Sequence, residues 1–196
     1  MRQLSNNRGI KLSQIRAFLA IDLDEDLKPK INDLIKEFQE IDAKVKYVEL
    51  ENLHLTLKFF GDIDEEGLNL LTEAIENVVS KFNPFKINIK SCGAFPNKKR
   101  IRVIKLGIED DSVLKDLHKQ LDNEFVQLGF DKDKKFSTHL TMGRVKSAKN
   151  KDLIKECIEE FEDIEIGEME VNQISLKKST LTPSGPIYED LKVFKL

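Results

Sequence analysis

The stretch His54-Leu55-Thr56-Leu57 decides how this chain is interpreted, because it recurs 85 residues later as His139-Leu140-Thr141-Met142. Each copy lies in an apolar segment of strand-like composition, with amphipathic helical patterns before and after it. The repeat therefore predicts two related lobes, each of which contributes one strand to a shared cleft.

Alternation within each copy separates its polar side chains from its apolar ones. Residues i and i+2 of a strand point to the same face, so His54 and Thr56 project together while Phe59 and the intervening leucines face a core. His139 and Thr141 share a face in the same way. One such pair alone would be interpreted as two exposed polar residues. The two copies, however, contain two of only three histidines in the chain, which favours a shared functional site.

Two imidazoles and two hydroxyls suit chemistry at a phosphorus atom. An imidazole titrates near neutral pH, so one can accept a proton from an attacking oxygen while the other donates a proton to the leaving oxygen. Threonine hydroxyls can donate hydrogen bonds to the non-bridging phosphate oxygens. Neither histidine has a carboxylate beside it on its own face, and no glycine-rich phosphate loop is present. The pattern predicts a site that needs no metal and no cofactor.

Composition narrows the class of protein. The chain has 196 residues, of which 40% are apolar and 34% charged, as expected for one globular domain. Its longest apolar run, Ala17–Ile21, is too short to cross a bilayer, so no membrane partner is expected. The net charge of −3 argues against indiscriminate binding of nucleic acid. Cys92 and Cys157 are too few for a disulfide framework, and predict free thiols in a reducing, cytoplasmic compartment.

Hydrophobic periodicity predicts the order of elements. Residues 1–14 are polar and are expected to form a flexible extension, and no linker divides residues 15–196, which are expected to form a single bilobal domain. The predicted fold is α+β and two-lobed, with pseudo-twofold symmetry and antiparallel sheets flanked by helices around a central cleft. Strands are expected at 15–21, 53–60, 85–89, 101–106 and 139–145, helices at 27–41, 68–82, 113–128 and 153–161, and further strands from 164 to 196 around a turn at 182–186.

The residues around both motifs carry a family resemblance. His54-Leu55-Thr56-Leu57-Lys58-Phe59-Phe60-Gly61 and His139-Leu140-Thr141-Met142-Gly143-Arg144 closely resemble the two signatures of the 2H phosphoesterase superfamily. The resemblance is strongest to its RNA 2′,3′-cyclic phosphodiesterases, also called 2′-5′ RNA ligases. It implies metal-independent hydrolysis of a terminal 2′,3′-cyclic phosphate on RNA to a 2′-phosphomonoester, with 2′-5′ ligation as the reverse reaction. The expected partner is RNA with such an end, tRNA fragments included, and the protein is expected to be a monomer.

The resemblance also assigns roles by match to the motifs. His54 corresponds to the proton donor for the leaving oxygen and His139 to the proton acceptor for water, while Thr56 and Thr141 hold the phosphate. Arg144 matches an arginine that contacts phosphate, although strict alternation places it on the apolar face. A β-bulge at Gly143 is expected to turn it towards the cleft. Thr138 departs from the family pattern, which commonly has proline before the second histidine.

The motifs recognise a phosphate and not a base, so two other functions stay open. One is the same chemistry on small cyclic nucleotides or 2′-5′ oligonucleotides. The other is a nucleotide-binding or RNA-binding module of the same fold that lacks turnover.

Three more residues carry expectations. Lys58 and Phe60 share the face of His54 by alternation. Lys58 either attracts phosphate or is solvated, and Phe60 either stacks on a base or ends the core of its strand. His118 lies opposite the apolar stripe of its helical pattern and is predicted to be a surface residue.

Overall fold

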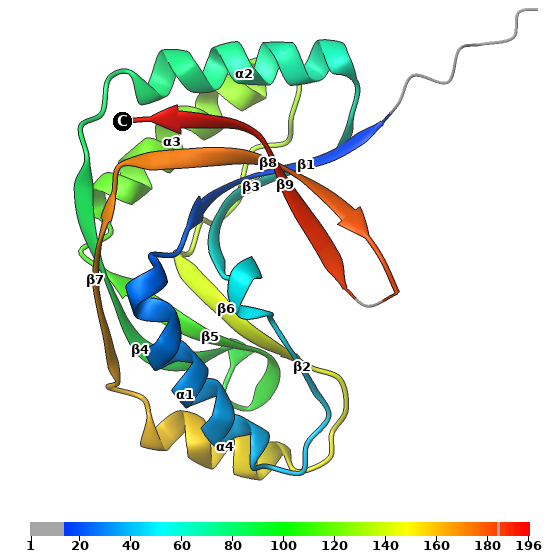
Figure 1. Ribbon diagram of the computed structural model, residues 1–196, viewed down its shortest axis with the longest axis vertical. Coiled ribbons are helices and arrows are strands. Elements are labelled where there is room, and N and C mark those ends of the chain that lie inside the picture. The colour runs from blue at the N-terminus through cyan, green and yellow to red at the C-terminus, as the bar shows by residue number, and fades with distance from the viewer. Residues whose placement is uncertain (1–13, 184) are drawn as a thin grey trace, which may run out of the picture.

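A single antiparallel sheet runs through the whole molecule (Figure 1). The structure is a computed structural model that describes residues 14–183 and 185–196. Within these residues it has nine strands and four α-helices. The strands are β1 (Ile15–Asp22), β2 (Val45–Tyr47), β3 (His54–Ile63), β4 (Phe85–Asn97), β5 (Arg100–Glu109), β6 (His139–Val145), β7 (Glu165–Val171), β8 (Gln173–Leu181) and β9 (Pro186–Lys195). The helices are α1 (Lys28–Gln39), α2 (Glu65–Val79), α3 (Ser112–Gln127) and α4 (Lys151–Glu160).

Two lobes meet at the middle of this sheet. The strand order is β7-β4-β5-β6-β3-β1-β8-β9, and the short β2 pairs with β6. Helices α2 and α3 contact each other on the lobe that contains β1, β3, β8 and β9, whereas α1 and α4 contact each other on the lobe that contains β4, β5 and β7 (Figure 1). Each lobe thus takes one helix from each half of the chain. The predicted two-lobed α+β class is confirmed.

The two motif strands touch at one point only. Strands β3 and β6 are antiparallel and share a single register pair, Leu55 with Leu140, and both side chains are buried. In an antiparallel pair, residues opposite each other share a face. Extending the register by one residue in each direction therefore places His54 across from Thr141 and Thr56 across from His139. The sequence repeat is brought together at the centre of the molecule.

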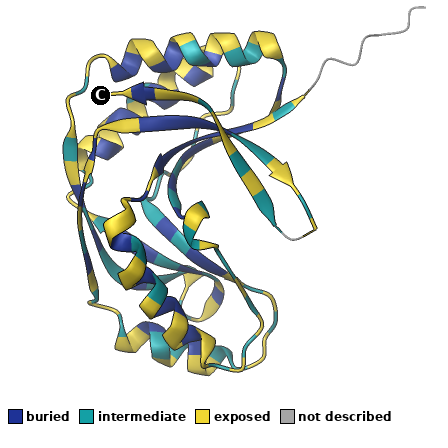
Figure 2. Cartoon of the chain, in the orientation of Figure 1, coloured by how far each residue is buried: buried dark blue, intermediate teal, exposed yellow. Residues whose placement is uncertain are grey.

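Helix α2 shows how local sequence supports the lobes. The Asp64 carboxylate caps its first turn by accepting a hydrogen bond from the Gly67 amide at 2.8 Å, and two glutamates follow in that turn, near the positive end of the helix dipole. One stripe of the helix is buried against the sheet, as Figure 2 shows for all four helices. Its buried residues are Leu71, Ala74, Ile75, Val78 and Val79.

Some sequence expectations differ from the structure or lie beyond it. The strand predicted at 85–89 continues to Asn97, and β2 was not predicted because three residues show no periodicity. Of the predicted extension, residues 1–13 lie outside the described residues. Cys92 and Cys157 are free thiols, and Cys92 is buried. Among the described residues, no helix is both long and apolar enough to cross a membrane.

Candidate active site

Both motif histidines are held in the same way. The Nδ1 atom of His54 lies 2.7 Å from the carbonyl oxygen of Asn52, and Nδ1 of His139 lies 2.8 Å from the carbonyl oxygen of Ser137. A carbonyl can only accept, so each Nδ1 carries the hydrogen and donates it. Each ring is thereby fixed by the backbone two residues before it. Its Nε2 atom is left to act as a proton acceptor when the ring is neutral and as a proton donor when it is charged.

A β-bulge follows the second motif and decides where Arg144 points. In the pairing of β5 with β6, Ile104 is opposite Gly143 and Lys105 is opposite Thr141, so Met142 is the extra residue. Met142 and Gly143 are both buried, and Arg144 is exposed and lines the cleft. The expected bulge is therefore present, and its extra residue is the neighbour of Gly143.

The first motif carries the same bulge, which overturns two expectations. In the pairing of β1 with β3, Leu19 is opposite Lys58 and Ala20 is opposite Thr56, so Leu57 is the extra residue. The faces exchange beyond it. Phe59, predicted to face the core, is 68% exposed and lines the cleft. Strict alternation failed because a bulge leaves no trace in hydrophobic periodicity.

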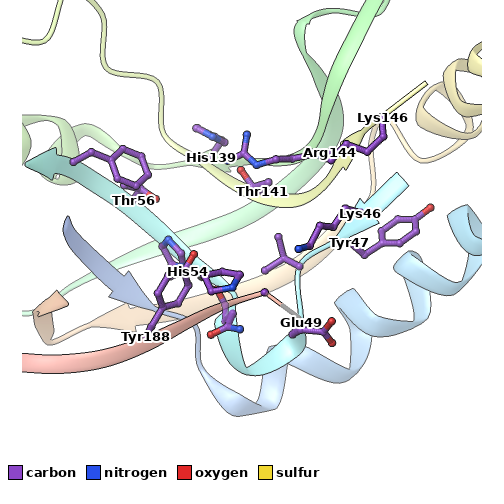
Figure 3. A pocket seen from close by; sticks show the side chains of 15 residues that line it. Lys46, Tyr47, Glu49, His54, Thr56, His139, Thr141, Arg144, Lys146 and Tyr188 are labelled. Atoms are coloured by element: carbon purple, nitrogen blue, oxygen red, sulfur yellow. Dashed lines mark hydrogen bonds between the residues drawn. The ribbon is translucent and has the colours of Figure 1, made fainter. Parts of the chain in front are cut away.

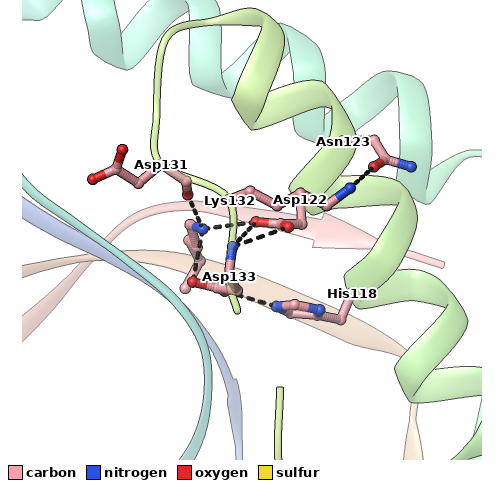
Figure 4. A network of polar contacts seen from close by, with 7 residues as sticks. His118, Asp122, Asn123, Asp131, Lys132 and Asp133 are labelled. Atoms are coloured by element: carbon pink, nitrogen blue, oxygen red, sulfur yellow. Dashed lines mark hydrogen bonds and ion pairs between the residues drawn. The ribbon is translucent and has the colours of Figure 1, made fainter. Parts of the chain in front are cut away.

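The prediction that Lys58 lies on the cleft face beside His54 is wrong for the same reason. Its side chain is buried on the other side of the sheet, where Nζ lies 2.7 Å from Asp122 Oδ1 and 2.9 Å from Asp133 Oδ1 (Figure 4). It also donates a hydrogen bond to the carbonyl oxygen of Asp131 at 2.8 Å. This lysine is committed to an internal ion-pair network and is neither solvated nor available to a phosphate.

Phe60 is a core residue, which was one of its two predicted roles. It is 8% exposed, and its ring packs edge-on against Phe125 and Phe130. The bulge moves it away from the cleft, and Phe59 takes the position that Phe60 was expected to hold. A base-stacking role for Phe60 is therefore wrong.

The prediction that His118 lies on the surface is also wrong. It is 6% exposed, and its ring stacks on Phe136 with centroids 3.6 Å apart. Its Nε2 lies 3.0 Å from Asp133 Oδ2 (Figure 4). The segment that leads to His139 folds over the polar face of α3 and covers this histidine. Helical periodicity describes burial against the sheet, but it cannot register a loop that returns to the opposite face.

The motif residues line one cavity of about 310 Å³ between the lobes (Figure 3). His54, Thr56, His139, Thr141 and Arg144 all contribute to its walls. The remaining polar and aromatic lining comes from β2 and the segment after it, from β3, from the residue that follows β6 and from β9, namely Lys46, Tyr47, Glu49, Asn52, Phe59, Lys146 and Tyr188. Cations outnumber carboxylates among the described lining residues, so the cavity suits an anion.

Burial lowers the pKa of both histidines. For His54, Lys177 and His139 add to this effect, while the hydrogen bond to Asn52 and the charge of Asp22 oppose it. For His139, Lys105 and Arg144 also lower the pKa, and the hydrogen bond to Ser137 opposes them. Both imidazoles therefore favour the neutral form in the empty site. A bound phosphate would raise both pKa values, because an anion stabilises a nearby imidazolium.

A family model matches the chain twice. The model, described as LigT like Phosphoesterase, covers residues 21–105 and again 106–188. The two matches start 85 residues apart, which is the separation of His54 and His139. This chain belongs to the LigT-like phosphoesterase family.

The similarity of this LigT-like phosphoesterase to its relatives extends over nearly its whole length. An RNA 2′,3′-cyclic phosphodiesterase of Methanothermobacter thermautotrophicus is 45% identical over 183 residues, which are 93% of this chain and 100% of the relative. One of Methanocaldococcus jannaschii is 43% identical over 178 residues, 91% of this chain and 99% of the relative. The solved structure of the Thermus thermophilus protein TT0787 superposes with a TM-score of 0.79 at 26% identity, covering 93% of this chain and 98% of that one.

Several lining residues of this LigT-like phosphoesterase escaped sequence reasoning. Tyr188 had no predicted role, yet its ring meets His54 edge-on at 5.4 Å between centroids. Lys46 and Tyr47 lie on the unpredicted β2, opposite Arg144 and Gly143 of β6. The one sequence signal for β2 is Gly143 itself, where a Cβ would come within 2.9 Å of Val45 Cγ1 and 3.1 Å of Tyr47 Cδ1. Glycine at this position lets the strand that carries Lys46 approach the site.

Proposed function

We propose that this protein hydrolyses the terminal 2′,3′-cyclic phosphate of RNA to a 2′-phosphomonoester, and does so without a metal ion. The observation that carries the proposal is the matched pair of imidazoles, each tethered through Nδ1 and each lining the same cavity. The relatives named for this activity, at up to 45% identity, support the same conclusion.

The chemistry follows from the two free Nε2 atoms. His139 accepts a proton from water as the water oxygen bonds to phosphorus. The bond from phosphorus to the 3′ oxygen breaks, and that oxygen takes a proton from charged His54. The product has a 2′-phosphate and a 3′-hydroxyl, and proton exchange with solvent resets both rings. Thr56, Thr141 and Arg144 donate hydrogen bonds to the non-bridging oxygens, where negative charge accumulates in the transition state.

The residues of the cavity favour acid–base chemistry over metal catalysis. Its described lining places three cations, Lys46, Arg144 and Lys146, with one carboxylate, Glu49. In the described part of the chain, the one cluster with ligand atoms close enough for a metal is His118, Asp122 and Asp133. That cluster lies on the face of the sheet away from the cavity, and Lys58 already forms ion pairs with both of its carboxylates.

Two further properties follow from the same site. A 5′-hydroxyl would take the place of water as the nucleophile, with His139 accepting its proton and His54 protonating the departing 3′ oxygen, so the same site would join a 2′,3′-cyclic phosphate to a 5′-hydroxyl through a 2′-5′ linkage, and water at high concentration favours hydrolysis. The proposed site residues line one cavity within a single chain, so no second copy is needed to complete the site. The two free thiols fit a reducing compartment.

The test is product analysis on an oligoribonucleotide that ends in a 2′,3′-cyclic phosphate, in the presence of EDTA. We expect quantitative conversion to the 2′-phosphate, identified by phosphorus NMR, at the same rate as without EDTA. A panel with cyclic mononucleotides, 2′-5′ oligonucleotides and tRNA fragments compares kcat/KM between substrate classes. A 3′-phosphate product, or loss of turnover in EDTA, contradicts the mechanism, and higher kcat/KM for mononucleotides than for RNA contradicts the substrate.

A further inference from the structure

The two histidines make equivalent hydrogen bonds to the backbone, but the charged residues near them differ. In the pairing of β1 with β3, Asp22 lies opposite His54. In the pairing of β5 with β6, the equivalent position opposite His139 is Gly107. A carboxylate thus stands beside the first histidine, and no side chain stands at the same place beside the second.

The positions opposite the two motif threonines also differ, and here the charged residue is a cation in the second lobe. Ala20 lies opposite Thr56 in the first lobe, and Lys105 lies opposite Thr141 in the second. Opposed residues share a face, so Lys105 projects to the face of the sheet that carries Thr141 and His139. Its ammonium lies 5.2 Å from the centroid of the Phe95 ring, which in turn meets the His139 ring edge-on at 4.8 Å.

Lys105 is half-buried and has no anionic partner among the residues that the structure describes, unlike Lys58 and Lys177, which each contact two carboxylates. Its nearest candidate counter-ion is the Cys92 thiol, but burial raises the pKa of that thiol to about 12, so it is neutral. Burial also lowers the pKa of Lys105. A cation without a counter-ion at a partly buried position lowers the stability of the fold unless a bound anion compensates its charge.

The charged groups that act on the two histidines differ in kind, because only His54 has a carboxylate among them. His139 is influenced by two cations, Lys105 from β5 and Arg144 from its own strand. The pKa of His54 is raised by the anion Asp22 and lowered by Lys177 and, when it is protonated, by His139. Lys177 is itself shared between Asp22 at 2.9 Å and Asp190 at 2.5 Å, so two carboxylates offset it.

We infer that Lys105 and Asp22 are positioning residues that determine which histidine is the base and which is the acid: Lys105 disfavours a proton on His139, and Asp22 favours one on His54. The inference rests on the proposed function for the roles themselves. Two imidazoles on either side of one phosphate would otherwise share a proton nearly equally, and only part of the enzyme would hold the productive arrangement.

The test is an NMR titration of the His54 and His139 imidazoles in the full chain. Replacing Lys105 with methionine keeps an unbranched side chain that is one atom shorter and removes its charge. We expect the K105M variant to raise the pKa of His139 by about 0.5–1 unit. D22N should lower the pKa of His54. The matched control is K86M, which removes an exposed β4 lysine that pairs with Glu168.

Charge and packing are separated by K105R, which should titrate like the wild type, and by K105Q, a second neutral variant should K105M fail to fold. An unchanged pKa of His139 in both neutral variants overturns the inference, as does an equal shift in K105R. In kinetics on RNA 2′,3′-cyclic phosphate, the limb of the kcat/KM profile that reports His139 should move to higher pH in K105M by the NMR shift. If the imidazoles shift as expected but no RNA is turned over, the proposed function fails and the charge asymmetry stands.

Discussion

Strands β3 and β6 repeat one another through four residues and one bulge, and then they diverge. Each has a histidine tethered to a backbone carbonyl and an extra residue at the fourth position of the motif. The next two residues are Lys58-Phe59 in the first lobe and Gly143-Arg144 in the second. The shared part suits a phosphorus atom held from two sides, while the divergent part makes the two walls of the cleft chemically different.

The two residues after each bulge lie on opposite faces of the sheet. In both strands the residue after the extra one turns away from the cleft, and the next residue turns into it. The first lobe uses the buried position for a lysine that joins α3 to the loop before His139. The second uses it for a glycine that admits β2. The same backbone device therefore positions the loop in one lobe and a strand in the other.

The largest expected effect tests whether the two histidines differ in role. H54A and H139A should each lower kcat on RNA 2′,3′-cyclic phosphate by about 10³-fold or more, since each step of acid or base catalysis contributes on the order of 10²–10⁴. The two variants should differ in activity on a phosphodiester whose leaving group is p-nitrophenolate, because this group departs without needing a proton. There H54A should recover most of its loss and H139A should not. Stopped-flow absorbance measures both variants.

The control for both variants is H118Q, which alters a buried histidine outside the cavity. It should lower stability and leave kcat within a factor of about two. Equal recovery of H54A and H139A on the activated substrate would mean that the lobes are interchangeable in chemistry as well as in backbone.

The next effect is on stability and tests the buried half of the comparison. K58M should lower the free energy of unfolding at pH 7 by about 3–5 kcal/mol, because it leaves two carboxylates without their counter-ion. Burial raises the pKa of Asp122, but its hydrogen bond and attraction to Lys58 outweigh burial and lower it. In the wild type this carboxylate therefore stabilises the fold above its unfolded pKa, and that contribution is lost as pH falls through its folded pKa.

Urea unfolding from pH 7 to below pH 3.8, the ordinary pKa of an aspartate, measures this pH dependence. Without Lys58, burial dominates and the pKa of Asp122 rises, so the gap between wild type and K58M should narrow as pH falls. The double variant K58M/D122N should recover part of the loss at pH 7. A loss below about 1 kcal/mol, or a gap that widens in acid, would show that the network does not hold the loop.

The sequence predicted the symmetric half of the site and missed the divergent half, for a physical reason. His54, Thr56, His139 and Thr141 obey alternation, which is a local rule, and they lie before the bulges. Arg144 was predicted only with the help of a family resemblance and a glycine. Phe59 and Lys58 lie after a bulge that contains no glycine or proline, so nothing local marked it.

Distance along the chain explains the remaining errors. The partner of Lys58 on α3 is 64 residues away, and the loop that covers His118 returns from beyond the end of that helix. Periodicity within a helix cannot foresee a contact made by another segment. The four helices were predicted because each carries a complete apolar stripe, whereas β2, with three residues, depends on the strand beside it.

The smallest expected effects compare the two residues that the bulges turn into the cleft. R144Q removes a charged donor to the phosphate and should lower kcat/KM by about 10²-fold on every cyclic phosphate substrate. F59L removes an exposed ring at the equivalent position and should raise KM about 5-fold with little change in kcat, since stacking on one base contributes about 1–3 kcal/mol. L70A, which removes an exposed leucine of α2, is the control and should change neither kcat nor KM.

On an oligonucleotide with an abasic site next to the cyclic phosphate, the F59L effect should vanish while the R144Q effect persists. If instead both variants respond alike to the missing base, the two walls of the cleft recognise the same part of the substrate, and the divergence after the bulges has no role in recognition.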